Sequence, residues 1–386
     1  MINLSVPNLS MDILENLKEC LESGWVSTGG RFIPEFEGKV IKYMKTKYAA
    51  GVQSGTAGLH MSLQVLGVQR DEEVIAPTLT FIAAVNPITY LGANPVFIDC
   101  DDSLCMDPLK LEKFCSEECD YIDGVLINKK TKRKIRALVV VHVFGNMVDM
   151  EKIMDIAKKY NLKVLEDATE ALGTYYTEGK YKSKYAGTIG DIGVLSFNAN
   201  KIITTGGGGM VIGDNEELVE KVRFLSSQAK KDPLYFIHDE IGYNYRMLNL
   251  QAALGTSQID QLESFIETKI KNYKIYKEEL EKVDGLEILP FREGTRPNYW
   301  FYSLKIDKEK YGIGRDELLR KLVESNIQTR PIWGLIHEQK PYVSFQSYEM
   351  EKSLYYYDRI LNLPCSSNLT EEEVHQVVEK IKELKK

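Results

Sequence analysis

The amino-acid sequence predicts an α/β fold built around a mostly parallel sheet, and three observations support this prediction. Between about residue 55 and residue 213, apolar runs short enough for buried strands alternate with segments of helical period. After residue 213, a long charged helical stretch leads into further strand and helix signals. The 386 residues are enough for two domains. We therefore expect a large domain over residues 1–255 and a smaller C-terminal α+β domain over residues 256–386.

The individual elements follow from local patterns. A helix that begins near residue 55 carries Leu59, Leu63 and Leu66 on one stripe. Buried strands are predicted at residues 73–76, 95–98, 137–141 and 164–165, and helices at residues 81–91 and 150–160. A charged helix over residues 262–283 is expected to connect the two domains and to precede an apolar segment at residues 285–290.

Composition and charge favour a small-molecule enzyme. The net charge of −7, with Lys and Arg scattered among Asp and Glu, argues against a general nucleic-acid-binding protein. Six cysteines include no CxxC pair, and Cys115 and Cys119 have no histidine nearby, so we expect reduced thiols and no metal site. No apolar run approaches the length of a membrane span, and the first residues lack the pattern of a secretory signal. We expect a cytoplasmic protein that binds no membrane.

Polar residues follow two of the predicted strands. His142 comes directly after the strand at residues 137–141, and Asp167 ends the segment that begins at residue 164. In open α/β sheets, ligands bind beyond the carboxyl ends of the strands, so both side chains are expected to face one crevice. A buried histidine that makes only structural hydrogen bonds is the alternative for His142.

A second feature indicates phosphate binding. Gly55, Thr56 and Ala57 lie at the predicted start of a helix, where backbone N–H groups point outward at the positive end of the helix dipole. An ordinary helix cap by Thr56 is the alternative. The four glycines at residues 206–209 lack the spacing and the flanking residues of a nucleotide-binding loop, so we expect them to form a turn.

Lys201 is the most informative residue in the chain. It closes the run Ser196 to Lys201, follows Asp167 by about thirty residues and precedes the four glycines. A lysine in a polar cleft can form an imine with an aldehyde, and an upstream aspartate can keep a pyridine nitrogen protonated. This combination is typical of a pyridoxal 5′-phosphate site, whereas a solvated surface charge is the alternative for any single lysine.

Taken together, these motifs resemble the DegT/StrS sugar aminotransferases over nearly the whole chain. The motifs that carry the resemblance are Ser54–Ala57, Pro77–Phe81, Glu166–Ala171, Gly190–Asp191, Ser196–Lys201 and Gly242–Arg246. The resemblance implies an aspartate-aminotransferase-like fold of type I with pyridoxal 5′-phosphate bound in the large domain. It also implies a homodimer whose active sites are shared between the subunits.

The resemblance assigns roles at the cofactor. Lys201 would hold the cofactor as an imine and move protons as general acid and base, and Asp167 would pair with the pyridine nitrogen. Phe81 would cover one face of the ring, and Glu170 would lie near the ring hydroxyl. The phosphate would be bound by Gly55, Thr56 and Ser196 of one subunit and by Asn244 of the other.

Two departures from the usual family pattern point to a subgroup. Gly207 replaces a glutamate, and Glu170 replaces a glutamine or histidine. These features resemble enzymes that use L-glutamate to aminate C4 of UDP-4-keto-6-deoxy-N-acetylglucosamine for bacillosamine, legionaminic acid and surface glycan synthesis. A 3-keto or a GDP-linked 4-keto sugar, or a non-catalytic regulatory protein of the same fold, are the alternatives. A 3-dehydratase is disfavoured because that branch replaces the lysine with histidine.

The same resemblance implies a sugar-nucleotide pocket that spans both subunits. Its expected lining residues are Trp25, Val26, Ser27, Thr28, Gln328, Thr329, Arg330 and Pro331, with Trp333 and His337 close behind. Arg330 could bind a diphosphate or the carboxylate of the amino donor. Plain core packing is an equal alternative for Trp25 and Trp333.

Overall fold

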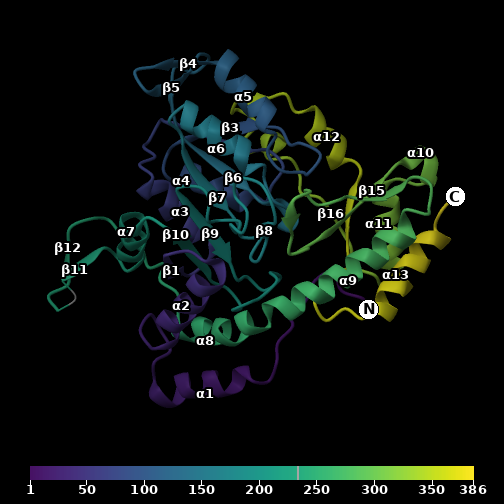
Figure 1. Ribbon diagram of the computed structural model, residues 1–386, viewed down its shortest axis with the longest axis horizontal. Coiled ribbons are helices and arrows are strands. Elements are labelled where there is room, and N and C mark those ends of the chain that lie inside the picture. Colours follow the sequence, from purple (N-terminus) through teal and green to yellow (C-terminus); the bar gives the residue numbers. More distant parts are fainter. Residues whose placement is uncertain (233) are drawn as a thin grey trace.

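A ten-stranded sheet forms the centre of the computed structural model, which describes residues 1–232 and 234–386 (Figure 1). The main path of the sheet runs β1-β10-β9-β7-β6-β2-β3-β17, and β4 and β5 continue from β6. Its strands are β1 (Tyr48–Val52), β2 (Glu73–Pro77), β3 (Asn94–Ile98), β4 (Cys119–Ile122), β5 (Val125–Asn128), β6 (Lys134–Val141), β7 (Lys163–Asp167), β9 (Ile192–Ser196), β10 (Gly209–Gly213) and β17 (Ser347–Tyr348). The prediction of a mostly parallel sheet is confirmed, because β9, β7, β6, β2, β3 and β17 all run in one direction.

A second sheet of four antiparallel strands lies in the C-terminal part of the chain. Its order is β13 (Leu286–Ile288), β15 (Tyr302–Ile306), β18 (Ile360–Leu363) and β16 (Arg330–Pro331). Two short pairs complete the strands: β8 (Tyr175–Tyr176) with β14 (Thr295–Arg296), and β11 (Lys230–Asp232) with β12 (Ile237–His238). Ile2 forms a bridge with Ile327, so the N-terminus lies beside the C-terminal part (Figure 1). We propose that the two domains divide between residues 255 and 256.

Helices surround both sheets. They are α1 (Ile13–Ser23), α2 (Phe32–Met44), α3 (Gly55–Val65), α4 (Asn86–Tyr90), α5 (Pro108–Glu117), α6 (Met150–Lys159), α7 (Glu216–Ser226), α8 (Asn249–Gln258), α9 (Leu262–Leu280), α10 (Lys308–Tyr311), α11 (Arg315–Glu324), α12 (Glu351–Tyr357) and α13 (Glu371–Glu383). Short 3₁₀ turns lie at Ile82–Ala84, Val143–Gly145, Ile259–Gln261 and Ile336–Glu338. Helix α9 runs from the large sheet to the C-terminal part (Figure 1), as the charged stretch at residues 262–283 predicts.

One predicted helix is wrong. The pattern over residues 81–91 predicts a single helix, whereas the structure has a 3₁₀ turn at Ile82–Ala84 and then the short helix α4. Pro87 explains the break, because proline lacks an N–H and is accommodated only in the first turn of a helix. Phe81 consequently stands outside any helix, with an extended backbone and an exposed side chain.

Two further observations concern the whole described chain. Over residues 1–232 and 234–386, no helix combines the length and the apolar character that crossing a bilayer would require. The six cysteines are buried as free thiols. These buried thiols pack as small apolar side chains.

Candidate active site

Strand direction brings the predicted site residues to one edge of the large sheet. Asp167 ends β7 and Ser196 ends β9, and these strands are parallel. Strand β10 is antiparallel to β9, so it begins at that same edge with Gly209. Strand β1 is antiparallel to β10 in turn, and the chain leaves it at the same edge toward Ser54 and α3. This convergence is what the rule for open α/β sheets predicts.

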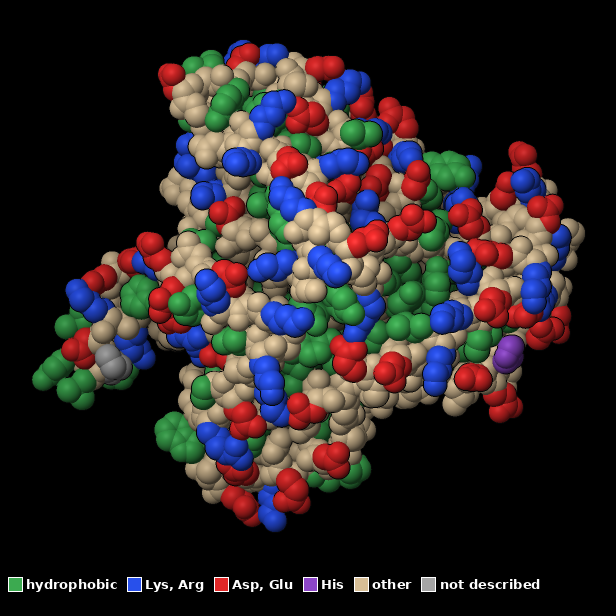
Figure 2. All heavy atoms as spheres, viewed as in Figure 1, with side chains coloured by type: hydrophobic (Ala, Val, Ile, Leu, Met, Phe, Trp, Pro, Cys, Tyr) green, Lys and Arg blue, Asp and Glu red, His purple; other side chains and the backbone are tan. Residues whose placement is uncertain are grey.

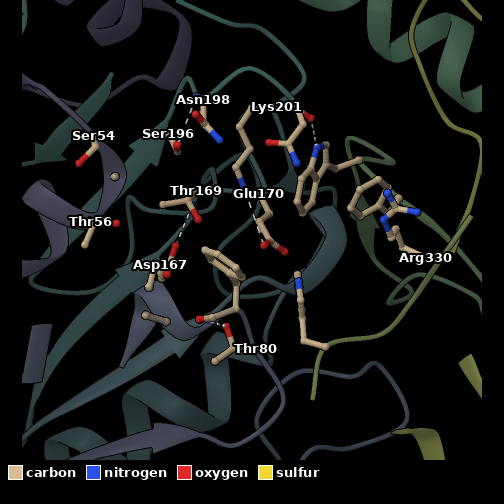
Figure 3. Close-up of a pocket in the computed structure, with 18 of the residues that line it drawn as sticks. Ser54, Thr56, Thr80, Asp167, Thr169, Glu170, Ser196, Asn198, Lys201 and Arg330 are labelled. Carbon is tan, nitrogen blue, oxygen red and sulfur yellow. Dashed lines mark hydrogen bonds and ion pairs between the residues drawn. The ribbon is translucent and has the colours of Figure 1, made fainter. Parts of the chain in front are cut away.

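A cavity of about 690 Å³ opens at this edge. Most of the residues predicted for the cofactor line it: Gly55, Thr56, Phe81, Asp167, Glu170, Ser196 and Lys201. In Figure 3, Ser54 and Thr56 lie at one end of the cavity and Arg330 at the other, with Lys201 and Glu170 between them. The volume lies within the range of pockets that hold a cofactor together with part of a substrate.

Lys201 lies among groups that control its charge. Its Nζ is 3.7 Å from Glu170 Oε1, and only 12% of its side chain is exposed. The ammonium lies over the ring of Trp300, 3.8 Å from the ring centre. Burial lowers the pKa of Lys201, while the charges of Glu170 and Asp167 act in the opposite direction. A lowered pKa increases the fraction of the amine that is neutral, and the neutral amine is the form that attacks an aldehyde.

Two buried carboxyl groups face this amine. Asp167 Oδ1 accepts a hydrogen bond from the Thr169 N–H at 3.0 Å, and burial raises the pKa of Asp167. Glu170 Oε2 accepts a hydrogen bond from the Phe144 N–H at 2.8 Å, and burial raises the pKa of Glu170 to about 7. Phe144 donates this bond from a left-handed backbone with φ of 56°, a conformation that costs energy for a residue with a side chain.

The phosphate-binding prediction rests on the first turn of α3. The helix is capped by Ser54, whose hydroxyl accepts a hydrogen bond from the Ala57 N–H at 3.1 Å. The helix cap is therefore Ser54 and not Thr56, which was the alternative to phosphate binding, and it occupies the N–H of Ala57. The N–H groups of Gly55 and Thr56 belong to the same turn, where no intrahelical acceptor exists. They lie at the positive end of the helix and beside the Ser196 hydroxyl.

Glycines allow the start of α3 to lie close to the ends of β9 and β10. A Cβ at Gly55 would lie 3.0 Å from Thr169 Cγ2 and 3.1 Å from Ser196 Cβ. A Cβ at Gly209 would lie 2.7 Å from the backbone nitrogen of Gly55. Gly207 and Gly208 line the cavity, so the predicted glycine turn is part of the wall of the site.

The expectation that His142 faces the crevice is wrong. His142 is fully buried and is absent from the cavity lining. Its Nε2 lies 3.0 Å from Glu166 Oε2, and its Nδ1 accepts the Val148 N–H at 3.2 Å. Glu166 also accepts backbone N–H groups from the turn at residues 187–190. The His142–Glu166 pair therefore holds the loops behind Asp167. This purely structural role is the alternative expected for a buried histidine.

The substrate-pocket predictions divide into two groups. Arg330, Pro331 and Trp333 line the cavity. Gln328 and Thr329 do not line it: the Gln328 side chain contacts the N-terminal residues, and Thr329 is fully buried. His337 lies outside as well, with its Nδ1 2.5 Å from the Thr78 hydroxyl.

A further set of predicted residues lies on the surface. Trp25, Val26, Ser27 and Thr28 follow α1 and are exposed, and Asn244 is exposed beside Ser227. Neither group lines the cavity of this chain. Their assigned roles stay predictions that require a second subunit.

Some residues that line the cavity were not predicted from the sequence. Trp300 lines the cavity from the C-terminal part and contacts Lys201, and Thr169, Asn198 and Asn200 also line it. Thr169 and Asn198 lie within the motifs around Asp167 and Lys201, so proximity in sequence could have indicated them. Trp300 is about one hundred residues from Lys201 in sequence, and only the fold brings the two together.

Comparison with known proteins gives one consistent result. The model of the DegT/DnrJ/EryC1/StrS aminotransferase family matches residues 7–382. EpsN of Bacillus subtilis (strain 168) is 35% identical over 98% of this chain and 94% of its own length. GDP-perosamine synthase of Escherichia coli O157:H7 is 36% identical over 98% of this chain and 96% of its own length. The crystal structure of the aminotransferase TlmJ from Streptoalloteichus hindustanus superposes with a TM-score of 0.88 at 26% identity, covering 100% of this chain and 98% of that one.

The residues of the cavity fit the cofactor of this family. Pyridoxal phosphate needs an amine for its aldehyde, an anion for its ring nitrogen and N–H or hydroxyl donors for its phosphate. Lys201, Asp167 and the group of Gly55, Thr56 and Ser196 line one cavity and offer these three kinds of chemical group. The chain belongs to the DegT/DnrJ/EryC1/StrS aminotransferase family and is a pyridoxal phosphate-dependent sugar aminotransferase.

Proposed function

We propose that the protein transfers the amino group of L-glutamate to C4 of a UDP-linked 4-keto-6-deoxy-N-acetylhexosamine. The product would be a UDP-4-amino-4,6-dideoxy sugar for surface glycan synthesis, made in the cytoplasm. Amine transfer is supported by the cluster of Lys201, Glu170 and Asp167 in one cavity, with Lys201 Nζ 3.7 Å from Glu170 Oε1. The UDP-linked substrate is supported by Gly207 and Glu170, the two departures from the usual family pattern. The presence of both Lys201 and Asp167 disfavours a non-catalytic regulatory role.

The chain's own residues can perform the proton transfers. When bound, pyridoxal phosphate supplies an electron sink that stabilises negative charge on the carbon that loses a proton. Lys201 would take a proton from the donor amino acid and later deliver one to C4 of the sugar, as a general base and acid with a lowered pKa. Asp167 would supply the negative charge that a protonated ring nitrogen needs. Protonation from the side of Lys201 would set the configuration at C4.

The remaining groups of the cavity would bind and orient the substrates. The Arg330 guanidinium lies at the end opposite Thr56 (Figure 3), where it could pair with a diphosphate or with the donor carboxylate. Phe81 and Trp333 form an apolar wall, with ring centres 6.5 Å apart. Such a wall suits the faces of the cofactor ring and the sugar.

A homodimer is part of the proposal. The hairpin of β11 and β12 projects from the body of the molecule, and hydrophobic side chains gather on it (Figures 1 and 2). Leu234, Tyr235, Phe236 and Ile237 are exposed there, an apolar patch that a second subunit could cover. Trp25 to Thr28 and Asn244 lie outside the cavity of their own chain, which supports their assignment to a shared site. Mass photometry at nanomolar concentration tests the dimer.

A GDP-linked 4-keto-6-deoxyhexose is the second candidate substrate. It is favoured by the relatives that are named GDP-perosamine synthase and are 32–36% identical to this chain. Both candidates share the keto group at C4 and the missing hydroxyl at C6, so the cofactor residues serve either one.

The test is mass-spectrometric detection of amine transfer from L-glutamate to each nucleotide sugar by the protein loaded with pyridoxal phosphate. Amination of the UDP sugar with little reaction of the GDP sugar supports the proposal. The reverse preference selects the second candidate. Conversion of the bound cofactor by glutamate, without amination of either sugar, directs the search to 3-keto sugars.

A further inference from the structure

Trp300 makes two contacts with the Lys201 segment that the proposed chemistry does not use. Its indole Nε1 donates a hydrogen bond to the Asn200 carbonyl oxygen at 2.8 Å. Its ring lies beneath the Lys201 ammonium, with the Nζ 3.8 Å from the ring centre. One side chain therefore contacts both the backbone immediately before the lysine and the reactive end of the lysine.

Trp300 is itself held by buried polar groups. Its N–H donates to Asn298 Oδ1 at 2.9 Å, and Asn298 Nδ2 donates to the Glu170 carbonyl oxygen at 2.9 Å. Its carbonyl oxygen accepts from the Nζ of the buried Lys269 at 3.2 Å. Asn298 thus links the backbone of Trp300 to the backbone of Glu170. Together with the hydrogen bond from Nε1 to Asn200, this link fixes the ring relative to Glu170 and Asn200. Buried polar networks with every member bonded are rigid.

The charged groups that face Lys201 are few. They are the carboxyl groups of Asp167, the last residue of β7, and of Glu170 in the loop that follows. Glu170 lies 3.7 Å from the ammonium, and no second cation of the described residues contributes to the pKa of Lys201. The Trp300 ring is accordingly the aromatic surface in contact with the amine, opposite two acids.

We propose that Trp300 is a positioning residue for Lys201. Its indole N–H holds the backbone before the lysine through the Asn200 carbonyl oxygen, and its ring face supports the free amine. A cation held over an indole face is attracted by the ring quadrupole, and the attraction increases when water is excluded. The ring therefore retains the amine near the reacting carbon between proton transfers. This inference rests on the proposed role of Lys201.

The rate of imine formation tests the proposal without requiring turnover. Pyridoxal phosphate is added to the full-length, cofactor-free chain across a pH series, and the absorbance change of the imine is followed. The rate follows the neutral fraction of the Lys201 amine. Trp300→Leu removes the ring and its N–H, and Trp300→Phe keeps an aromatic face. Tyr276→Phe is the matched control, because the described residues offer its buried hydroxyl no hydrogen-bond partner.

The two accounts of Trp300 predict opposite shifts. Loss of the attraction destabilises the protonated amine, so Trp300→Leu should move the midpoint of the pH profile down by about one unit. Trp300→Phe should move it by about half as much, and Tyr276→Phe should leave it in place. If Trp300 only fills space, its removal admits water and the midpoint rises toward that of an ordinary lysine. A rise, or no shift in either Trp300 variant, overturns the proposal.

Borohydride reduction separates this failure from failure of the proposed function. If the reduced cofactor is found on Lys201 in every variant and the midpoint does not fall, the role of Trp300 is refuted and that of Lys201 stands. If the wild-type protein is labelled at another residue, the proposed role of Lys201 fails, and the inference about Trp300 fails with it. Should Trp300→Leu not fold, Trp300→Phe alone decides the sign of the shift.

Discussion

Lys201 and Lys269 are both largely buried lysines, and both contact Trp300, but their surroundings differ. Lys201 reaches the ring of Trp300 inside a cavity of about 690 Å³, opposite the carboxyl groups of Glu170 and Asp167. Lys269 is 2% exposed, and its Nζ donates to the carbonyl oxygens of Trp300 and Cys365. Burial lowers the pKa of both lysines.

This contrast shows that a lowered pKa does not by itself identify a catalytic lysine. Lys201 has space for a reacting molecule and two acids that can exchange protons with it. Lys269 has neutral acceptors and is not among the residues that line the large cavity, so its amine serves to satisfy two buried carbonyl groups. Reactivity follows from the cavity and the carboxyl groups, which burial alone does not provide.

Replacing each of the two lysines separately should give the largest difference in the rate of amine transfer. We expect Lys201→Ala to lose at least about 10⁴-fold in amine transfer, because the general acid and base is removed. Lys269→Met should lose no more than about tenfold, since Lys269 reaches the site only through the backbone of Trp300. The rate of amine transfer from glutamate measures both variants. Equal losses in the two variants would contradict the comparison.

Removing the charge of Asp167 should give the next largest effect. Asp167→Asn keeps an oxygen that can accept the Thr169 N–H, so the local fold should survive. The loss of negative charge should slow the proton transfer step by about 10²–10³-fold. Stopped-flow absorbance measures this step, and circular dichroism checks the fold. Unchanged proton transfer in a folded variant would refute the role of this carboxylate.

The hydrogen bonds that join the two lysine environments can be broken at Asn298. Its side chain donates to the carbonyl oxygens of Glu170 and Leu172 and accepts the Trp300 N–H. Asn298→Ala leaves these three buried groups without partners and should lower the free energy of unfolding by about 3 kcal/mol. Chemical denaturation measures the loss. A change below about 0.5 kcal/mol would show that other groups replace Asn298.

The pH dependence of stability should give the smallest effect. Burial raises the pKa of Glu170 from 4.5 to about 7 in the folded protein. The folded state therefore binds more protons than the unfolded state between these values, and stability falls as pH rises through about 7. In the cofactor-free protein, Glu170→Gln should remove a decline of about 2 kcal/mol between about pH 5.5 and pH 8.5. Urea denaturation of both proteins at the two pH values measures it. Parallel pH profiles would contradict the raised pKa.

Much of the fold and of the cofactor site was predictable because the signals are local. Strands β2, β3 and β6 contain short apolar runs, β7 contains Val164 and Leu165, and Asp167 at the end of β7 lines the crevice. Lys201 and Asp167 lie in such local motifs. The break at Pro87 could have been predicted too, since proline marks the start of a new helix.

The remainder of the site depends on long-range packing. Trp300 and Asn298 come from the segment before β15, and no local pattern connects them with Lys201 or Glu170. His142 follows a strand just as Asp167 does, but its hydrogen bonds to Glu166 and Val148 turn it away from the cavity. Sequence patterns place residues at a strand end, whereas neighbouring side chains decide which way each one points.

Chemical labelling can locate the lysine that binds the cofactor. The protein is mixed with pyridoxal phosphate, reduced with borohydride, digested and analysed by mass spectrometry, with Lys201→Ala and Lys269→Met treated in parallel. We predict that the wild-type protein and Lys269→Met carry the label on Lys201, and that Lys201→Ala carries none. A label on Lys269 or on another residue of the wild-type protein would contradict the assignment of this cavity as the active site.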